Sequence, residues 1–257
     1  MIEETVDPYW RQVLAFNRLP DFTALWDLRA DWFEPPNERR GGWSGVAKIA
    51  LELPEGGTVN AFLKRQENHG CRTWRHPLRG VPTFAREFAN IIRLRACGVP
   101  TLEPLYFGMD KKGSMPGRAV LLTRSLEGYE PIGSGTFAPD GAWSRHWANR
   151  CALLTALAGV IRRMHDHRLQ HGCLYPKHVL ARVEQDGGVD IRLIDLEKLR
   201  RQPWGALASM HDLDALNRHA RGWSRTDRLH FLLAYLGEKR LSGRGRSLWH
   251  RLARRFR

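Results

Sequence analysis

One segment of this 257-residue chain restricts its fold more than any other, namely residues 169–180 followed by residues 191–195. It contains a His, a short polar loop, a hydrophobic pair, a turn and an apolar strand that ends in Asp195. This order predicts two short strands joined by a turn, with the histidine loop before them and the carboxylate after them. Ionisable side chains are thereby concentrated at one place, which makes this segment the first candidate for a functional site.

The pattern of the chain changes near its middle. Strand-like segments, two of them joined by a Pro-Glu-Gly-Gly turn, occupy the first half: 46–53, 59–64, 102–109 and 119–123. Segments with helical spacing of apolar residues lie mainly in the second half: 84–97, 143–167, 207–219 and 225–236. Strands followed by helices predict an α+β chain with a small sheet-rich lobe and a larger helical lobe.

We expect four regions along the chain, in this order: an N-terminal extension at 1–37, a small lobe at 38–123, a large lobe at 124–237 and a basic C-terminal segment at 238–257. Residues 66–83 show no clean period, so we interpret them as an ordered or mobile insert. A Lys-Lys-Gly turn at 111–113 is expected to join the last two strands of the small lobe.

The composition of the chain limits the kinds of molecule that we expect it to bind. The chain has 41 Lys and Arg against 27 Asp and Glu, a net charge of +14, which favours anionic partners. No helix-turn-helix, zinc-finger or RNP-like signature accompanies this charge, so we expect no specific nucleic-acid partner. The four cysteines are widely spaced, the N-terminus lacks a secretory pattern, and no apolar run is long enough to span a bilayer. These features predict a cytoplasmic protein.

The order of a Gly-rich turn, a strand Lys, a helix Glu, a His loop and a strand-end Asp resembles the protein-kinase-like fold. The Tyr175-x-x-His178 spacing and the stretches 212–216 and 227–236 are similar to the bacterial lipopolysaccharide core kinases. That family groups Kdo and heptose kinases with InaA-like proteins, and the resemblance covers roughly residues 38–237. It implies a bilobal α+β fold, with a small N-terminal antiparallel β lobe carrying one helix and a larger helical C-terminal lobe.

The same resemblance implies an ATP-dependent phosphotransferase with Mg²⁺ as its metal. Its acceptor would be a sugar hydroxyl of the lipopolysaccharide core, an anionic glycolipid. In the small lobe, Lys64 would contact the ATP phosphates and pair with Glu87, 23 positions later. Gly41, Gly42 and Gly45 would fold backbone over the phosphates. Each of these residues also has an ordinary structural interpretation. Lys64 would be an edge-strand lysine, Glu87 a glutamate favoured by the helix dipole, and the three glycines part of a plain hairpin.

In the large lobe, the resemblance implies that His171 has a structural role in the catalytic loop and that Asp195 binds the Mg²⁺ ion. His178 stands where most kinases carry a metal-binding Asn, and Glu197 adds a carboxylate that could reach the same ion. Alternatives stay open for both His178, as a loop His bonded to backbone, and Asp195, as a capping residue.

Cys173 occupies the position of the catalytic Asp. A neutral thiol is a weak proton acceptor, so it performs the role of general base poorly. A second hypothesis is therefore a pseudokinase or stress-response protein that binds nucleotide with little or no phosphotransfer.

Two further patterns concern the support of the catalytic loop and the binding of zinc. Asp212 and Asp214 resemble a helix acid that braces the catalytic loop, although two solvated carboxylates explain them equally well. The cluster His165, His167, His171, Cys173 and His178 matches none of the standard zinc spacings, so we expect no zinc site there.

The C-terminal segment 239–257 carries eight Lys and Arg residues. Its apolar residues fall on one helical face: Leu248, Trp249, Leu252 and Phe256. This pattern is typical of an interfacial helix on anionic lipid, which would place the protein on the inner face of the cytoplasmic membrane. The alternative is a packed terminal helix with a solvated basic side.

Overall fold

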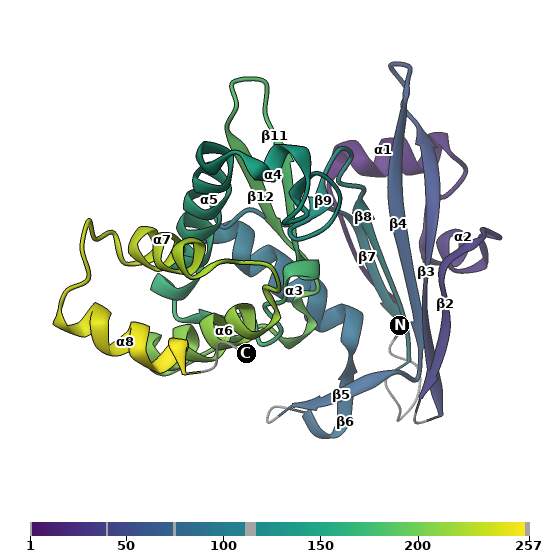
Figure 1. Cartoon of the computed structure of the whole chain (residues 1–257). Coiled ribbons are helices and arrows are strands. Elements are labelled where there is room, and N and C mark those ends of the chain that lie inside the picture. Colours follow the sequence, from purple (N-terminus) through teal and green to yellow (C-terminus); the bar gives the residue numbers. More distant parts are fainter. Residues whose placement is uncertain (1, 40, 74–75, 111–116, 255–257) are drawn as a thin grey trace. The chain divides into compact units, whose positions relative to one another are not determined.

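The structure is a computed structural model that describes residues 2–39, 41–73, 76–110 and 117–254 (Figure 1). Its contacts divide the chain into unit 1, Met1–Ile91 with Leu102–Leu126, and unit 2, Ile92–Thr101 with Glu127–Arg257. Unit 1 is rich in antiparallel sheet and the larger unit 2 is mainly helical. The predicted α+β fold with a sheet-rich and a helical lobe is therefore confirmed.

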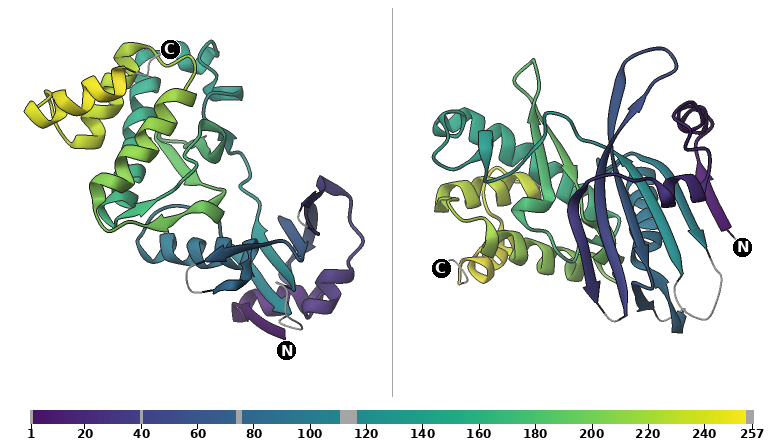
Figure 2. Two further views of the ribbon diagram at one scale, coloured as in Figure 1. Left: turned by 90° about the horizontal axis from the view of Figure 1, so that it is seen from below. Right: turned by 90° about the vertical axis from the view of Figure 1, so that its right-hand side faces the viewer.

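A six-stranded antiparallel sheet forms the frame of unit 1, and its strands run side by side in Figure 2. The order is β1-β7-β8-β4-β3-β2. The strands are β1 (Ile2–Val6), β2 (Trp32–Arg39), β3 (Gly42–Glu52), β4 (Thr58–Glu67), β7 (Pro104–Asp110) and β8 (Arg118–Arg124). The two strands predicted on either side of the Pro-Glu-Gly-Gly turn correspond to β3 and β4, which pair antiparallel. The turn predicted at 111–113 lies outside the described residues.

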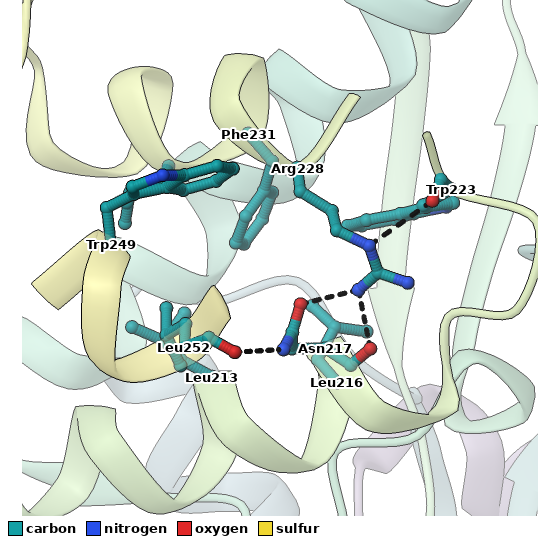
Figure 3. A pocket seen from close by; sticks show the side chains of 9 residues that line it. Leu213, Leu216, Asn217, Trp223, Arg228, Phe231, Trp249 and Leu252 are labelled. Carbon is teal, nitrogen blue, oxygen red and sulfur yellow. Dashed lines mark hydrogen bonds between the residues drawn. The ribbon is translucent and has the colours of Figure 1, made fainter. Parts of the chain in front are cut away.

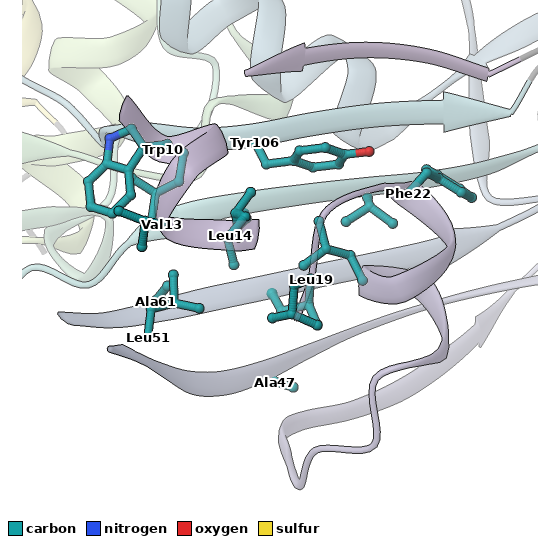
Figure 4. Packing of buried hydrophobic residues seen from close by; sticks show 14 residues of the cluster. Trp10, Val13, Leu14, Leu19, Phe22, Ala47, Leu51, Ala61 and Tyr106 are labelled. Atoms are coloured by element: carbon teal, nitrogen blue, oxygen red, sulfur yellow. The ribbon is translucent and has the colours of Figure 1, made fainter. Parts of the chain in front are cut away.

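Two N-terminal helices, α1 (Pro8–Phe16) and α2 (Phe22–Asp27), cover one face of this sheet (Figure 4). Each begins with an aspartate whose side chain accepts a backbone N–H of the first turn, from Tyr9 to Asp7 and from Ala24 to Asp21. Their apolar residues join those of the strands in one buried cluster: Trp10, Val13, Leu14, Phe22, Leu25, Leu51, Ala61, Leu63 and Tyr106, among others. Residues 10–30 thus contribute to the core of unit 1, and β1 and β2 form the two edges of its sheet.

The helix α3 (Thr83–Ala96) begins in unit 1, and Phe88 stacks on Phe107 of β7 with ring centroids 4.5 Å apart. Gln66 of β4 is buried and accepts hydrogen bonds from the Phe84 amide and the Thr83 hydroxyl. Its side chain therefore satisfies the start of the helix. The predicted insert before α3 contains an antiparallel hairpin of β5 (Gly70–Thr73) and β6 (His76–Pro82).

Helices dominate unit 2: α4 (Ala142–Arg145), α5 (Trp147–Asp166), α6 (Gly205–His219), α7 (Arg225–Leu236) and α8 (Gly243–Ala253). The sequence predicts one helix over 143–167, but the structure interrupts it at His146, whose backbone is extended. The carbonyls of Trp143 and Ser144 accept hydrogen bonds from the side chains of Asn149 and Arg150. These bonds replace the backbone bonds that a continuous helix would make there.

Short strands complete unit 2. A three-stranded sheet has the order β12-β11-β9, and β10 pairs with β13. Their bounds are β9 (Glu130–Pro131), β10 (Leu169–Gln170), β11 (Val179–Val183), β12 (Val189–Leu193) and β13 (Arg200–Arg201). The strand pair predicted from the opening motif is β11 and β12. In the part of the chain that is described, no helix has the length and apolar character needed to cross a bilayer.

The C-terminal helix α8 packs against α6 and α7 through Trp249 and Leu252 (Figure 3). The Leu252 carbonyl also accepts a hydrogen bond from the Asn217 amide of α6, at 3.1 Å. The space left among these residues is about 20 Å³, room for one water molecule. Two of the apolar residues expected to face lipid are thus buried in protein, as in the packed-helix alternative, and Phe256 lies outside the described residues.

We predict that Trp249→Ala lowers the free energy of unfolding of unit 2 by about 3 kcal/mol, because it removes a buried aromatic side chain from this contact. Trp204→Ala is the matched control: Trp204 is 68% exposed, and its loss should change stability by less than about 0.5 kcal/mol. Urea unfolding followed by circular dichroism measures both. Equal effects of the two substitutions would contradict the packing of α8.

Candidate functional site

Unit 1 contains one candidate group of functional residues, an ion pair between a strand and a helix. The Lys64 Nζ of β4 lies 2.6 Å from the Glu87 Oε1 of α3, with side chains 18% and 4% exposed. The predicted pairing of these two residues is present. A buried carboxylate is costly without a partner, so Glu87 fixes the position of the ammonium group. The Lys64 side chain keeps some exposure, and its Nζ also lies 5.9 Å from the centre of the Phe84 ring.

The glycines predicted to cover phosphates lie in the hairpin of β2 and β3. A Cβ on Gly42 would lie 2.3 Å from the backbone of Asn68, and one on Gly45 would lie 2.7 Å from the Trp32 ring. Both positions therefore require glycine for packing within unit 1. Gly41 has a φ of +77°, with open space around it. Phosphate binding by these glycines stays a prediction.

Unit 2 contains a separate candidate group, which begins where β12 leads to Asp195. The Leu193 carbonyl accepts a hydrogen bond from the Thr101 hydroxyl at 2.6 Å, and the Ile194 amide donates to the His178 carbonyl at 3.0 Å. Asp195 itself has a left-handed backbone, with φ 58° and ψ 59°, which costs of order 1 kcal/mol for a residue other than glycine. The chain therefore turns sharply at the carboxylate, and the strand before it is held on both sides.

A buried carboxylate holds the start of the loop. Asp212 of α6 is fully buried and accepts hydrogen bonds from two loop amides, His171 at 2.6 Å and Gly172 at 3.0 Å. Gly172 has a φ of +85°, and a Cβ there would lie 2.9 Å from the Lys198 carbonyl oxygen. The bracing role expected for Asp212 is therefore present, whereas Asp214 pairs with Arg218 on the same helix.

His165 and Tyr235 extend this network, although no sequence motif predicted a role for either of them in it. His165 Nε2 lies 3.2 Å from Asp212 Oδ2, and His165 Nδ1 lies 2.9 Å from the Tyr235 hydroxyl. Burial raises the pKa of Tyr235 to about 12, so its hydroxyl keeps a proton to donate to His165. One signal for His165 was available, because it follows Ile161 by four positions on the buried face of α5.

Burial also determines the protonation states of His171 and Cys173 in the loop. Desolvation of the fully buried His171 lowers its pKa, and its Nε2 lies 3.0 Å from the Ile194 carbonyl. A carbonyl only accepts, so Nε2 carries the proton and Nδ1 faces the Cys173 Sγ at 3.6 Å. Burial and the neighbouring Asp195 charge raise the pKa of Cys173 to about 12. At neutral pH Cys173 is a buried thiol, which cannot accept a proton from an attacking hydroxyl.

The structure brings Cys173, His178 and Asp195 together. One ligand atom from each lies within 4.8 Å of the others. His178 Nε2 is 3.1 Å from Asp195 Oδ2, and their side chains are 12% and 36% exposed. Glu197 is not a member of this group; its carboxylate lies 4.0 Å from the Lys198 Nζ. Metal binding by Asp195, His178 and Glu197 stays a prediction.

This donor set suits Mg²⁺ only in part. Mg²⁺ prefers oxygen ligands in octahedral geometry, and proteins often hold it through one or two carboxylates together with substrate phosphates. Asp195 supplies one such carboxylate, partly exposed. The imidazole and the thiol are softer donors. The residues therefore fit a Mg²⁺ ion that arrives with nucleotide phosphates rather than one bound by protein alone.

Comparison with known proteins identifies the family. A sequence model of the lipopolysaccharide kinase (Kdo/WaaP) family matches residues 23–235. The chain belongs to this family. The InaA protein of Escherichia coli K12 is 32% identical over 199 residues, which cover 77% of this chain and 88% of that protein. A solved structure of WaaP in complex with acyl carrier protein has a TM-score of 0.71 and 19% identity, and the match covers 99% of this chain and 98% of that one.

Membership of the lipopolysaccharide kinase family agrees with the resemblance drawn from the loop motif. The family match begins at residue 23, earlier than the 38 expected from the sequence, and therefore includes β2 and all of α2 except Phe22.

We predict that Asp212→Asn costs about 2–3 kcal/mol in the free energy of unfolding of unit 2, because an amide nitrogen would face buried N–H donors. Asp214→Asn, two residues away, is the control. Its side chain is 14% exposed and pairs with the half-exposed Arg218 one turn later on the same helix, so the change should cost under about 1 kcal/mol. Chemical denaturation of both variants measures the difference.

The same carboxylate predicts a pH dependence. Burial alone raises the pKa of Asp212, but hydrogen bonds from His165 and from the two loop amides outweigh it, and the pKa lies below its usual value. Its contribution is therefore present above the unfolded pKa of about 3.9 and is lost as pH falls through the lower folded value. The stability difference between wild type and Asp212→Asn should shrink below about pH 4; a constant difference would contradict the assignment.

Proposed function

We propose that this chain is an ATP-dependent kinase that transfers the γ-phosphoryl group to a sugar hydroxyl of the lipopolysaccharide core or a related glycolipid. The family supplies the substrate class. The observation that carries the proposal is the ion pair of Lys64 with Glu87, since a strand lysine held by a helix glutamate is the phosphate-binding arrangement of kinases. The net charge of +14 supports an anionic acceptor.

In this proposal Lys64 contacts the α- and β-phosphates of ATP. Glu87 keeps the ammonium group in place, so little side-chain entropy is lost when nucleotide binds. Gly41, Gly42 and Gly45 contribute backbone beside the phosphates, although the packing of Gly42 and Gly45 within the hairpin is itself sufficient reason for two of the three glycines.

Asp195 is proposed to hold Mg²⁺, with His178 beside it. A bound Mg²⁺ would neutralise the charge that develops on the phosphates during transfer. His171 supports the loop and does not touch substrate. Glu197, which lies next to Lys198, is available as a further carboxylate.

Cys173 supports a second candidate function, that of a pseudokinase which binds nucleotide with little or no transfer. The thiol is buried and its pKa is raised to about 12, so the position of the general base holds a proton donor. Phosphoryl transfer depends mainly on positioning and electrostatics, and loss of the base should therefore slow an active kinase by about 10²–10⁴-fold.

A glycolipid acceptor places the reaction at the inner face of the cytoplasmic membrane. Contact with anionic lipid would depend on the exposed arginines of α8 (Arg244, Arg246 and Arg251) rather than on insertion of its apolar face. We propose a cytoplasmic protein that meets its acceptor there peripherally.

Transfer of labelled phosphate from Mg-ATP to a lipid A–core acceptor tests the proposal. Asp195→Ala should lower the rate by at least about 10³-fold, because it removes the carboxylate proposed to hold the metal. Asp186→Ala is the control, since Asp186 is exposed in the turn between β11 and β12. Wild-type transfer by Asp195→Ala would refute the assigned role.

Cys173→Asp separates the two candidate functions. An active but slowed kinase should gain about 10²-fold or more when a carboxylate replaces the thiol, and Cys173→Ser should leave the rate within about threefold. Thermal-shift titration with Mg-ATP confirms that each variant is folded and binds nucleotide. Binding without transfer in both wild type and Cys173→Asp would favour the pseudokinase.

A further inference from the structure

The hydrogen bonds of His178 define which of its ring nitrogens is free. His178 Nδ1 lies 2.8 Å from the Cys173 carbonyl oxygen, which can only accept, so Nδ1 carries a proton. With its proton on Nδ1, the ring points Nε2 away from that bond, and Asp195 Oδ2 lies 3.1 Å from Nε2. When Nε2 carries no proton, it and Oδ2 are both acceptors, and a positive ion between them would satisfy both.

This is also the arrangement of a metal-binding histidine. Such residues donate their second N–H to a carbonyl or carboxylate, which fixes the ring and makes the other nitrogen a better ligand. The Cys173 carbonyl has this role for His178, and it also accepts the Tyr175 amide at 2.8 Å. The ring orientation is therefore determined by the loop backbone.

A third donor completes one side of the site. Cys173 Sγ lies 3.7 Å from Asp195 Oδ2. Zinc bonds of about 2.0–2.3 Å give tetrahedral ligand–ligand separations of roughly 3.3–3.6 Å. The 3.1 Å between His178 Nε2 and Asp195 Oδ2 and the 3.7 Å to the sulfur lie on either side of this range. Asp195 is partly exposed, which leaves a fourth position for water.

We propose that Cys173, His178 and Asp195 form a site for a borderline-soft divalent cation such as Zn²⁺, which binds without nucleotide. A thiol, an imidazole and a single carboxylate favour Zn²⁺ over Mg²⁺. Binding replaces the S–H bond of Cys173 with an S–metal bond, and the proton is released to the solvent. The cluster rejected from sequence already contained Cys173 and His178, together with three other histidines. The site proposed here has Asp195 in place of those three, and the pairing of β11 with β12 brings Asp195 back beside the loop.

The site shares residues with the proposed kinase site but does not depend on that function. Co²⁺ is the probe, because a thiolate ligand gives it a charge-transfer absorption in the near ultraviolet. Titration of the metal-free, full-length protein in the absence of ATP and acceptor should give this band, with saturation at one equivalent and release of one proton per ion. Zn²⁺ should then displace Co²⁺, whereas excess Mg²⁺ should not.

Variants assign the ligands. Cys173→Ser should abolish the band and weaken Zn²⁺ binding by at least about 100-fold, the upper range seen even for indirect partners of a metal. His178→Gln should weaken Zn²⁺ binding by at least about 10-fold. This variant tests the site independently if Cys173→Ser does not fold. A variant with Cys71, Cys97 and Cys151 all changed to Ser should keep the band, because Cys173 remains.

Absence of the band in wild type, its persistence in Cys173→Ser, or its loss in the triple-serine variant would each overturn the proposal. These titrations contain no nucleotide, so a negative result leaves the kinase assignment intact. A failed phosphotransfer assay likewise leaves the metal site intact.

Discussion

The buried Asp212 carboxylate is the interaction on which the candidate site of unit 2 depends. An ionised carboxylate in the protein interior is stable only when hydrogen bonds replace its water, and here two loop amides and His165 do so. Those bonds determine where the chain runs at His171 and Gly172, and the following turn presents Cys173 and His178 beside Asp195. The relative positions of Cys173, His178 and Asp195 thus depend on one buried charge in α6.

Unit 1 uses the same principle with a different pair. Glu87 is buried and Lys64 is its partner, while Gln66, two residues further along β4, satisfies the start of α3. Alternate residues of one strand therefore fix both the helix and the lysine. Because Lys64 is held before any ligand arrives, the arrangement is preorganised for an anion, which is the physical basis of the nucleotide-binding proposal.

Much of this could be predicted from the sequence, since periodicity located the strands 46–53 and 59–64 and the helix 225–236, and motif spacing led to Lys64, Glu87 and Asp195. Other features depend on tertiary contacts that no local pattern reveals. The helices α1 and α2 are short, and their stability comes from packing on the sheet. The break at His146 arises from side chains three and four residues later. The amphipathic pattern of α8 fits a membrane or a protein partner equally well, and only the contacts of Trp249 distinguish them.

Asp212 holds the loop in place before any ligand binds, through its hydrogen bonds to two loop amides. Hydrogen exchange at the backbone amides of His171 and Gly172 tests it directly. If both amides donate to a buried carboxylate, they should exchange only when unit 2 unfolds, with the same free energy as the core amides of α5. Exchange of these two amides at the rate of an open loop, while α5 stays protected, would contradict the claim.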